Sequence, residues 1–316
     1  MSLDNNAAAR LPRITIFTPC RDGERFIAGA IESVRRQGYP ELDHVVLDAC
    51  STDGTLALLG RYPQLTVISE PDAGAHDAMN KGVARETGEI IGFLNVDDFY
   101  PDGALIEVGR IFAEDADVDV VVGRSVVFED DASGGRKVLF VRSHGEADGL
   151  WLSELTFGVP GFNGCFFRRR VFERGAIFRT DYAFTGDRKF LMDLALAGRK
   201  SRLLDRPTIW YRLHPGSRTV NREKTHLMEI SREYVRMALE LAGERRDRPA
   251  MHRVFMAWHA FEAAKLTVRS LRAGRLGEAF HVFVALNRRN PLWLFRLAEA
   301  FSLRRAVKRL EFRPDH

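Results

Sequence analysis

Residues 69–100 of the chain read SEPDAGAHDAMNKGVARETGEIIGFLNVDDFY. This stretch predicts a helix over Ala75–Arg85 that stops at Gly88, followed by a short apolar strand over Glu89–Leu94. The strand runs directly into the polar cluster Asn95–Asp98. A helix, a buried strand and a polar strand end form the repeating unit of an α/β fold.

The same alternation continues on both sides of this stretch. Four further strands are predicted at Ile14–Pro19, His44–Asp48, Leu65–Ser69 and Val118–Val122. Three further helices are predicted at Phe26–Arg36, Thr55–Leu59 and Gly103–Phe112. Strands and helices that alternate about every 20 residues predict an α/β fold, with a mostly parallel sheet and helices on both faces.

Polar clusters follow four of the predicted strands: Thr18–Asp22, Asp48–Asp53, Glu70–Asp77 and Asn95–Asp98. In an open α/β sheet, ligands bind outside the carboxyl ends of the strands. We therefore expect these four loops to form one crevice.

Beyond residue 123 the pattern is less regular. Strands are predicted at Lys137–Val141 and Thr208–Arg212, and helices at Leu150–Leu155 and Gly186–Ala197. From Glu223 onward the pattern is helical only, with helices at Glu223–Ala242, Met251–Arg272, Leu276–Asn287 and Leu292–Leu310. The sequence thus predicts an α/β domain over residues 1–222 and a helical C-terminal extension over residues 223–316.

Composition narrows the class of protein. The chain has 316 residues, of which 45% are hydrophobic and 28% charged, and this excludes disordered and fibrous proteins. Cys20, Cys50 and Cys165 are too few and scattered for a disulfide framework. With no apolar signal-peptide core before Ile14 and no membrane-spanning run of about 20 apolar residues, we expect a cytoplasmic protein.

The net charge of +4 is unevenly distributed. From Met251 to His316 there are 13 Lys and Arg against five Asp and Glu, a surplus of +8, so the first 250 residues carry −4. An acidic body with a basic tail is therefore expected.

Three places carry candidate chemistry. Asp97 and Asp98, adjacent at the end of an apolar strand, favour a hard divalent cation such as Mg²⁺ or Mn²⁺, although a solvated loop is the ordinary alternative. Asp187 opens a predicted helix, where it is either an N-terminal cap or a general base. His214 follows a strand and is either a third ligand or structural. Phosphate-loop motifs and the GxSxG hydrolase motif are absent from the sequence.

These residues, in this order, carry a family resemblance. The strings ITIFTPCRDGERF (14–26), VVLDACSTDGT (45–55) and the quoted 69–100 stretch resemble the GT-A inverting glycosyltransferases of glycosyltransferase family 2. The EPDAGAHDAMNKG string looks like the bacterial branch that builds surface polysaccharides. The resemblance is dense over residues 13–102 and looser over 161–217.

The resemblance implies a GT-A fold with a donor half and an acceptor half. Residues 13–123 would bind the nucleotide sugar and residues 124–222 would form the acceptor side. Thr18, Pro19 and Arg21 would line the pocket for the base, and Asp48 would lie beside the base or ribose.

The helix after EPDAG and the acid pair carry further implied roles. Asp77, Asn80 and Lys81 would shape the donor pocket. Asp97 and Asp98 would be the DxD-type pair, the first contacting ribose or metal and the second coordinating the metal.

The later motifs complete the implied site. Asp187 would be the general base, and His214 would join the metal or diphosphate site. Two positions depart from the family pattern: Ala49 stands where members often carry a second acid against the base, and Lys189 stands where many carry another acid.

The resemblance implies a metal-dependent inverting glycosyltransferase. It would use Mn²⁺ or Mg²⁺ and a nucleotide-diphosphate sugar, with a UDP-sugar as the expected donor. Its acceptor would be a hydroxyl of a cell-envelope or exopolysaccharide glycan, free or lipid-linked.

Two alternatives are weaker. A sugar-phosphate nucleotidyltransferase would begin with a Gly-rich basic loop, which TPCRDGERF lacks. A non-catalytic carbohydrate-binding protein would not need Asp97, Asp98 and Asp187 intact.

The tail remains open between two interpretations. Leu292–Phe295 and Phe301 alternate with basic residues (Arg296, Arg304, Arg305, Lys308 and Arg309), which is typical of an amphipathic basic helix. Such a helix either lies on an anionic membrane, here the cytoplasmic face of the inner membrane, or packs on the catalytic domain. Nucleic acid is not an expected partner, because no recognised binding motif accompanies the charge.

Overall fold

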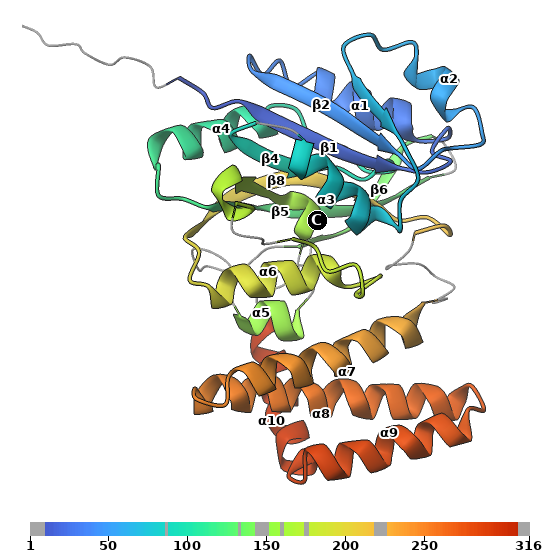
Figure 1. Cartoon of the computed structure of the whole chain (residues 1–316), viewed down its shortest axis with the longest axis vertical. Helices are drawn as coiled ribbons and strands as arrows, with labels where there is room; N and C mark the ends of the chain where they lie inside the picture. Colours follow the sequence, from blue (N-terminus) through green and yellow to red (C-terminus); the bar gives the residue numbers. More distant parts are fainter. Residues whose placement is uncertain are drawn as a thin grey trace, which may run out of the picture.

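The computed structural model describes residues 10–85, 88–131, 134–142, 152–158, 161–173, 177–217 and 226–308. Figure 1 shows two layers of structure along the long axis: a sheet flanked by helices at one end, and a set of long helices at the other. The expected combination of an α/β body with a helical extension is confirmed.

The sheet has eight strands in the order β3-β2-β1-β4-β7-β5-β6, with β8 paired to β5. Their bounds are β1 Ile14–Cys20, β2 Leu42–Asp48, β3 Thr66–Ser69, β4 Ile90–Phe93, β5 Val120–Asp130, β6 Arg136–Arg142, β7 Cys165–Arg168 and β8 Ser201–Arg212. The pairs β1–β2, β1–β4, β2–β3 and β5–β8 are parallel, whereas β7 is antiparallel to β4 and β5, and β6 is antiparallel to β5. The predicted mostly parallel sheet is thus confirmed, and β7 is an added strand that the sequence analysis missed.

Helices cover both faces of the sheet, as predicted. Their bounds are α1 Ile27–Arg35, α2 Thr55–Leu59, α3 Ala75–Arg85, α4 Ala104–Glu114, α5 Leu152–Phe157 and α6 Gly186–Leu196. Side chains of α3, α5 and α6 share one core with Phe17 and Phe93 on one face of the sheet. Side chains of α1 and α4 share another core with Ile16 and Phe166 on the other face.

Two predicted strands are longer in the structure. The strand predicted at Val118–Val122 begins at Val120 and continues to Asp130, and the strand predicted at Thr208–Arg212 begins at Ser201. The two strands pair in parallel from Val120 with Ser201 to Phe128 with Arg212.

The helical region consists of α7 (Leu227–Glu244), α8 (Pro249–Arg272), α9 (Leu276–Arg289) and α10 (Trp293–Lys308). Helix α8 is central and contacts the other three. The predicted helices are confirmed with small shifts at their ends, except that residues 223–225 of the first one and residues 309–310 of the last one lie outside the described residues.

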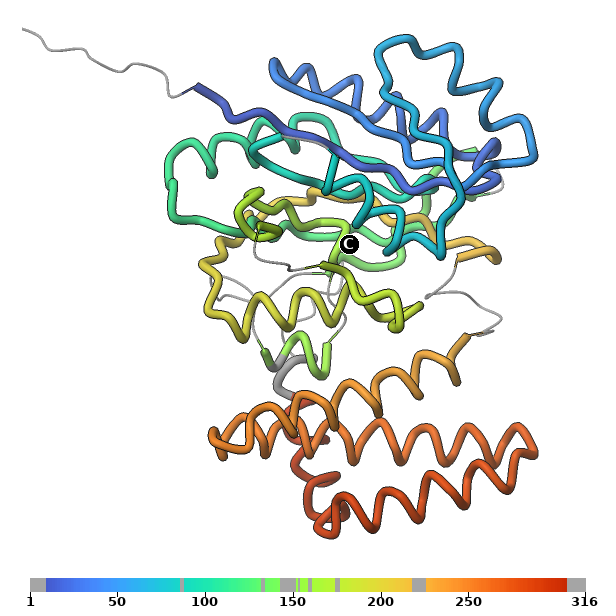
Figure 2. The backbone as a smooth tube through the Cα atoms, in the orientation of Figure 1, coloured from blue at the N-terminus to red at the C-terminus, as the bar shows by residue number. Residues whose placement is uncertain are grey.

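The helical region packs on the α/β body instead of standing apart from it. Helices α5 and α8 are in contact, and so are α5 and α10. Phe157 and Leu191 of the body belong to the same buried cluster as Leu241, Phe255 and Trp258 of the helices. Figure 2 follows the chain from the sheet into this layer of helices at the far end. In the described part of the chain, no helix combines the length and hydropathy needed to cross a bilayer.

Candidate active site

The strand ends that the sequence predicted to converge do lie at one edge of the sheet. Cys20 at the end of β1 pairs with Asp48 at the end of β2, and Asp48 pairs with Ser69 at the end of β3. Strand β4 lies on the other side of β1 and leads into Asn95–Asp98. The parallel order therefore brings the four predicted loops to the same side of the sheet.

The loops after β1 and β2 are tied to each other. The backbone N–H of Asp22 donates to Ser51 Oγ (2.8 Å), and the N–H of Thr52 donates to Asp22 Oδ1 (2.8 Å). In the described chain, Asp22 and Cys50 are the non-glycine residues with positive φ, at 49° and 55°. A non-glycine residue with positive φ is strained and persists only where surrounding contacts hold it. The hydrogen bonds between these two loops therefore fix their conformation at this edge of the sheet.

Asp98 is almost fully buried and is held by three hydrogen bonds. Its Oδ1 accepts from the backbone N–H of Arg212 (2.9 Å), and its Oδ2 accepts from Asn95 Nδ2 (3.0 Å) and Asn163 Nδ2 (3.2 Å). Burial, followed by the charge of Asp97, raises the pKa of the Asp98 carboxyl well above its ordinary value. Asp98 thus joins three distant parts of the chain behind the strand end.

Asp97, the adjacent acid, is partly exposed and faces His214. Its Oδ2 lies 2.8 Å from His214 Nε2, and 21% of its side chain is exposed. The Gly216 N–H donates to His214 Nδ1 (3.2 Å), so Nδ1 is the acceptor nitrogen and Nε2–H donates to Asp97. The ring of His214 also packs 4.8 Å from the ring of Phe26.

These side chains fit a hard divalent cation. Carboxylate suits Mg²⁺ and Mn²⁺, and neutral imidazole can add a ligand through Nε2 in the tautomer that carries its proton on Nδ1, which would replace the contact with the Gly216 N–H. No group of three His, Cys, Asp or Glu side chains suited to a metal occurs among the described residues. Mg²⁺ is usually bound by one or two protein carboxylates, with substrate phosphates and water as its other ligands. Direct coordination by Asp98, Asp97 and His214 stays a prediction.

Two of the predicted donor-side residues line one small hollow at the ends of β2 and β3. Asp48 and Lys81 line it together with Glu70 and Asp72. Asp48 accepts hydrogen bonds from Ser69 Oγ (2.6 Å) and the Ser51 N–H (3.1 Å).

Lys81 connects this hollow to helix α3. Its Nζ donates to Pro71 O (2.9 Å) and forms an ion pair with Asp77 (2.8 Å). The hydrogen bond from Lys81 lowers the pKa of Asp77, which also accepts from the Ala73 N–H (3.0 Å) at the start of α3.

The structure gives other predicted donor-side residues contacts of different kinds. Thr18 is fully buried, and a hydrogen bond joins its Oγ1 to His44 Nε2 (2.9 Å). Asn80 uses both ends of its amide on the backbone of Phe178 (2.8 and 2.9 Å). Pro19 is half-buried, and Arg21 extends into solvent. Thr18 and Asn80 thus hold the frame of this region, and their predicted contacts with a donor stay predictions.

Asp187 lines a second hollow, on the side of the sheet edge that carries β5 and β8. The lining residues are Ser125, Arg142, Gly161, Phe162, Asn163, Asp187, Ile209 and Tyr211. Asp187 lies in the first turn of α6 and accepts a hydrogen bond from the Arg188 N–H (2.7 Å). Asn163, which lines this hollow, also donates to Asp98. A single residue therefore connects the second hollow to the acid pair.

Helix α7 holds the turn that leads into α6. The carboxylate of Glu233 accepts from the Phe184 N–H (3.1 Å) and from Thr185 Oγ1 (2.8 Å). Glu240 accepts from Tyr182 Oη (2.9 Å) and pairs with Arg179 (2.5 Å). The helical region therefore helps to fix the start of the helix that carries Asp187.

Sequence reasoning missed Asn163 and Arg212. Both contact Asp98 from positions more than 60 residues away, one through a side-chain amide and the other through a backbone N–H. No motif marks either residue, and only the unpredicted strand β7 next to Asn163 would have signalled that this segment enters the sheet.

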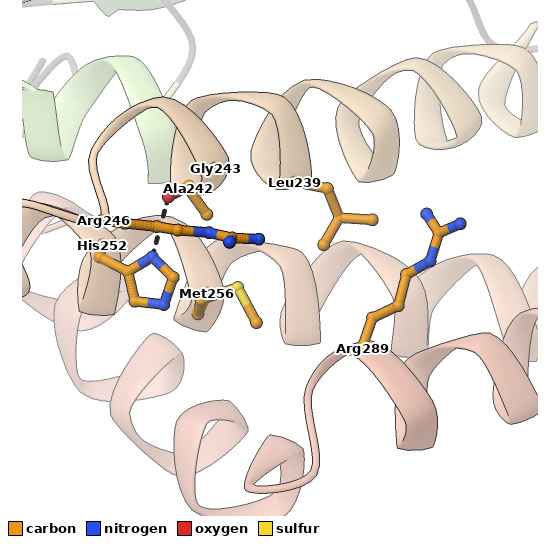
Figure 3. Close-up of a pocket in the computed structure, with 7 residues that line it drawn as sticks. All are labelled: Leu239, Ala242, Gly243, Arg246, His252, Met256 and Arg289. Carbon is orange, nitrogen blue, oxygen red and sulfur yellow. Dashed lines mark hydrogen bonds between the residues drawn. The ribbon is translucent and has the colours of Figure 1, made fainter.

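A larger hollow lies elsewhere. It has a volume of about 600 Å³ and lies between α7, α8 and the end of α9. Figure 3 shows Arg246 and Arg289 on either side of Leu239, with His252 Nδ1–H donating to Ala242 O (2.8 Å). None of the predicted site residues lines it, so chemistry and not size marks the candidate active site.

A mostly parallel α/β sheet with an acid pair at a strand end and a second carboxylate across the crevice is the arrangement expected of GT-A proteins. Residues 15–175 match the family described as Glycosyl transferase family 2. The chain therefore belongs to glycosyl transferase family 2.

Two curated relatives are similar over shorter stretches. TuaG of Bacillus subtilis, a glycosyltransferase named for teichuronic acid biosynthesis, is 33% identical over 92 residues, which cover 28% of this chain and 36% of TuaG. A PGL/p-HBAD biosynthesis glycosyltransferase of Mycobacterium tuberculosis is 30% identical over 118 residues, which cover 35% of this chain and 46% of that protein. The chain thus matches less than half the length of each of these relatives.

Two solved structures share the fold over nearly the whole chain. S. aureus TarS 1-349, in complex with UDP-GlcNAc, has a TM-score of 0.62 at 16% identity, over 94% of this chain and 90% of that one. The mannosyltransferase PcManGT from Pyrobaculum calidifontis, in complex with GDP-Man and Mn²⁺, has a TM-score of 0.54 at 20% identity, over 95% and 86%. At these identities the likeness concerns the fold.

Proposed function

We propose that this chain transfers a sugar, with inversion, from a nucleotide-diphosphate sugar to a hydroxyl group of a glycan acceptor. One observation carries the proposal: Asp187 and Asn163 line the same hollow, and Asn163 donates to Asp98 of the acid pair. Asn163 thus lies between Asp187, whose carboxylate can act as a base, and the acid pair Asp97 and Asp98, whose carboxylates suit a cation.

In this reaction Asp187 is the general base. It takes the proton of the acceptor hydroxyl as the hydroxyl oxygen forms a bond to the anomeric carbon, on the face opposite the leaving group. The bond between that carbon and the diphosphate oxygen breaks, and its electron pair leaves with the nucleoside diphosphate. Asp187 is left protonated and returns the proton to solvent, so no covalent intermediate with the enzyme forms.

Asp97 and His214 would hold the cation, with Asp98 behind them. A bound Mn²⁺ or Mg²⁺ would offset the negative charge that develops on the departing diphosphate. The partly exposed carboxylate of Asp97 favours it for direct coordination, whereas the three hydrogen bonds of buried Asp98 favour a role in orienting Asn163 and the Arg212 backbone.

For the donor we propose a UDP-sugar bound at the ends of β1, β2 and β4, beside Asp48 and Lys81. The complexes of TarS with UDP-GlcNAc and of PcManGT with GDP-Man and Mn²⁺ support a nucleotide sugar and a divalent metal. Thr18, Pro19, Arg21, Asp77 and Asn80 remain the proposed frame of this donor site.

For the acceptor we propose a cell-envelope glycan, either free or lipid-linked, on the cytoplasmic side of the membrane. The names of the teichuronic acid and PGL/p-HBAD relatives support this class of product. We further propose residues 1–222 as the catalytic domain and residues 223–316 as its helical support.

A donor screen tests the first half of the proposal. Nucleotide sugars are added with and without Mn²⁺, and the melting temperature is measured, because a ligand that binds only the folded chain stabilises it. We expect a UDP-sugar to raise the melting temperature more with Mn²⁺ than without it. Absence of a shift with every nucleotide sugar would contradict a donor site.

Asp187→Asn tests the second half. We expect it to lower turnover by about 10²–10⁴-fold, since the base is lost, while the donor-induced shift in melting temperature remains. The matched control is Asp193→Asn on the same helix, whose carboxylate pairs with Lys189 (2.6 Å) and lies outside the hollow. Turnover of Asp187→Asn close to that of the control would remove Asp187 from the base role.

The two alternatives predict different products. A carbohydrate-binding protein would bind the sugar without releasing nucleoside diphosphate, and a nucleotidyltransferase would release pyrophosphate from a nucleoside triphosphate and a sugar phosphate. Mass spectrometry of the nucleotide products distinguishes all three.

A further inference from the structure

Exposed apolar side chains gather at one end of the molecule. Of the 14 large hydrophobic side chains that are exposed in the described chain, ten lie between residues 268 and 301. They are Val268, Leu271, Leu276, Phe280, Phe283, Val284, Leu292, Leu294, Phe295 and Phe301. Scattered exposed apolar residues are ordinary, but a concentration of this size marks an interaction surface.

Helix α9 presents a continuous apolar face, which we call the α9 face and define as Leu276, Phe280, Phe283 and Val284. Their spacing of four, three and one places them on one side of a helix. Leu276 and Phe280 are 67% and 71% exposed, whereas Ala279 and Leu286 of the same helix are buried. One side of α9 therefore packs against the protein, whereas the side chains of the α9 face stay between 37% and 71% exposed.

The start of α10 adjoins the α9 face. The ring of Phe283 lies 6.1 Å from the ring of Trp293, and Trp293 Nε1–H donates to Asn287 Oδ1 (3.1 Å). Figure 1 shows α9 at the end of the long axis opposite the sheet. The surface thus stands at the tip of the molecule, away from the candidate active site.

The charge around the α9 face is strongly basic. Between Val268 and Arg305 the chain has eight arginines, two glutamates and no lysine or aspartate. Glu278 pairs with Arg232 (2.7 Å), and Glu299 pairs with Arg253 (2.5 Å). Both acids of the segment are thus engaged by arginines outside it, and the eight arginines give the region a surplus of positive charge.

We propose that the α9 face binds an anionic lipid surface, with the Leu and Phe side chains in the interface and the surrounding arginines on the lipid headgroups. Apolar anchors flanked by arginine fit the boundary between headgroups and acyl chains. A second copy of the chain fits less well, because it would bring two basic surfaces together. The exposed apolar residues at 292–301, which the sequence pattern already marked, thus lie at the edge of a surface centred on α9. This inference concerns a partner and does not rest on the proposed reaction.

Vesicle co-sedimentation of the full chain tests the proposal. At 50 mM salt we expect the chain to pellet with phosphatidylglycerol vesicles, to stay in solution with phosphatidylcholine vesicles, and to be released at 0.5 M salt. The variant Leu276→Ser/Phe280→Ser should bind phosphatidylglycerol vesicles at least tenfold more weakly. The control Leu56→Ser/Val67→Ser makes the same change at two exposed positions of the α/β body and should bind like the original chain.

Other outcomes would overturn the proposal. These are failure of the original chain to pellet with phosphatidylglycerol vesicles, equal binding to both lipids, or unchanged binding by the α9 variant. Sedimentation velocity without lipid adds an independent check, since a dimer that the α9 variant dissociates would identify a second copy as the occupant. Circular dichroism and the melting temperature of both variants show that each is folded.

Discussion

At the scale of single residues, Asp97 and Asp98 show how a turn gives two identical side chains different tasks. One carboxylate faces a histidine at the edge of the crevice, and the other is buried against two amides and a backbone N–H. A buried carboxylate needs such partners, since an unpaired buried charge is costly. The pair therefore divides into an outward group that can meet a ligand and an inward group that organises the wall behind it.

Asn163 connects the acid pair to the hollow on the acceptor side. Replacing it with alanine removes one of three hydrogen bonds to Asp98 and part of the wall shared with Asp187. We expect Asn163→Ala to lower turnover by about tenfold or more and the free energy of unfolding by about 1–2 kcal/mol. The measurements are a transfer assay and urea denaturation.

A matched control for Asn163 is Asn287→Ala in α9, an exposed asparagine with no contact to either hollow. It should leave turnover unchanged. If Asn163→Ala and Asn287→Ala have the same turnover, Asn163 is not a link between the acid pair and the acceptor side.

At the scale of elements, the start of α6 depends on α7. Glu233 holds the Phe184 N–H and the Thr185 hydroxyl immediately before Gly186 and Asp187. We expect Glu233→Ala to lower kcat by about tenfold, because the turn that orients Asp187 loses its acceptor, and the free energy of unfolding by about 1–3 kcal/mol. The KM for the donor should stay unchanged, since the donor side is formed by β1, β2 and β4.

Two further variants separate positioning from general destabilisation. Glu233→Gln keeps an acceptor oxygen and should recover most of kcat. Glu244→Ala, at the exposed end of the same helix, should behave like the original chain. A rise in donor KM without a fall in kcat would contradict a positioning role for Glu233.

The elements also show where prediction from the sequence succeeds and where it fails. Helices such as α2 and α3 have the predicted bounds because each is set by the local spacing of its apolar residues. Strand β7 has only four residues, and its partners Ile90 and Val120 lie far away in the sequence, so no local pattern announces it. The candidate site divides in the same way: Asp97, Asp98 and Asp187 lie in local motifs, whereas Asn163 and Arg212 become visible only when the sheet is assembled.

At the scale of the whole molecule, the charge division has a structural counterpart. The acidic part of the chain contains the sheet and α7, and the basic part begins within α8 and includes α9 and α10. The two interpretations of the tail are therefore not exclusive, because α8 packs into the shared core while α9 keeps an apolar face exposed.

The shared core predicts that the catalytic domain does not stand alone. A chain ending at residue 222 would leave Phe157 without Phe261, whose ring lies 6.3 Å away, and would remove Trp258 from the buried cluster that also holds Leu191. It would also lose the carboxylates of Glu233 and Glu240 that hold residues 179–185. Each large core side chain contributes about 1.5–3 kcal/mol when buried, and a domain is stable by only about 5–15 kcal/mol. We therefore expect residues 1–222 to aggregate or to unfold without a cooperative transition, as measured by calorimetry and size-exclusion chromatography.

A chain ending at residue 274 keeps α7 and α8 and should retain a cooperative transition. If the 1–222 chain instead melts within a few degrees of the full chain and turns over donor, the helical region is an appendage and not part of the folding unit.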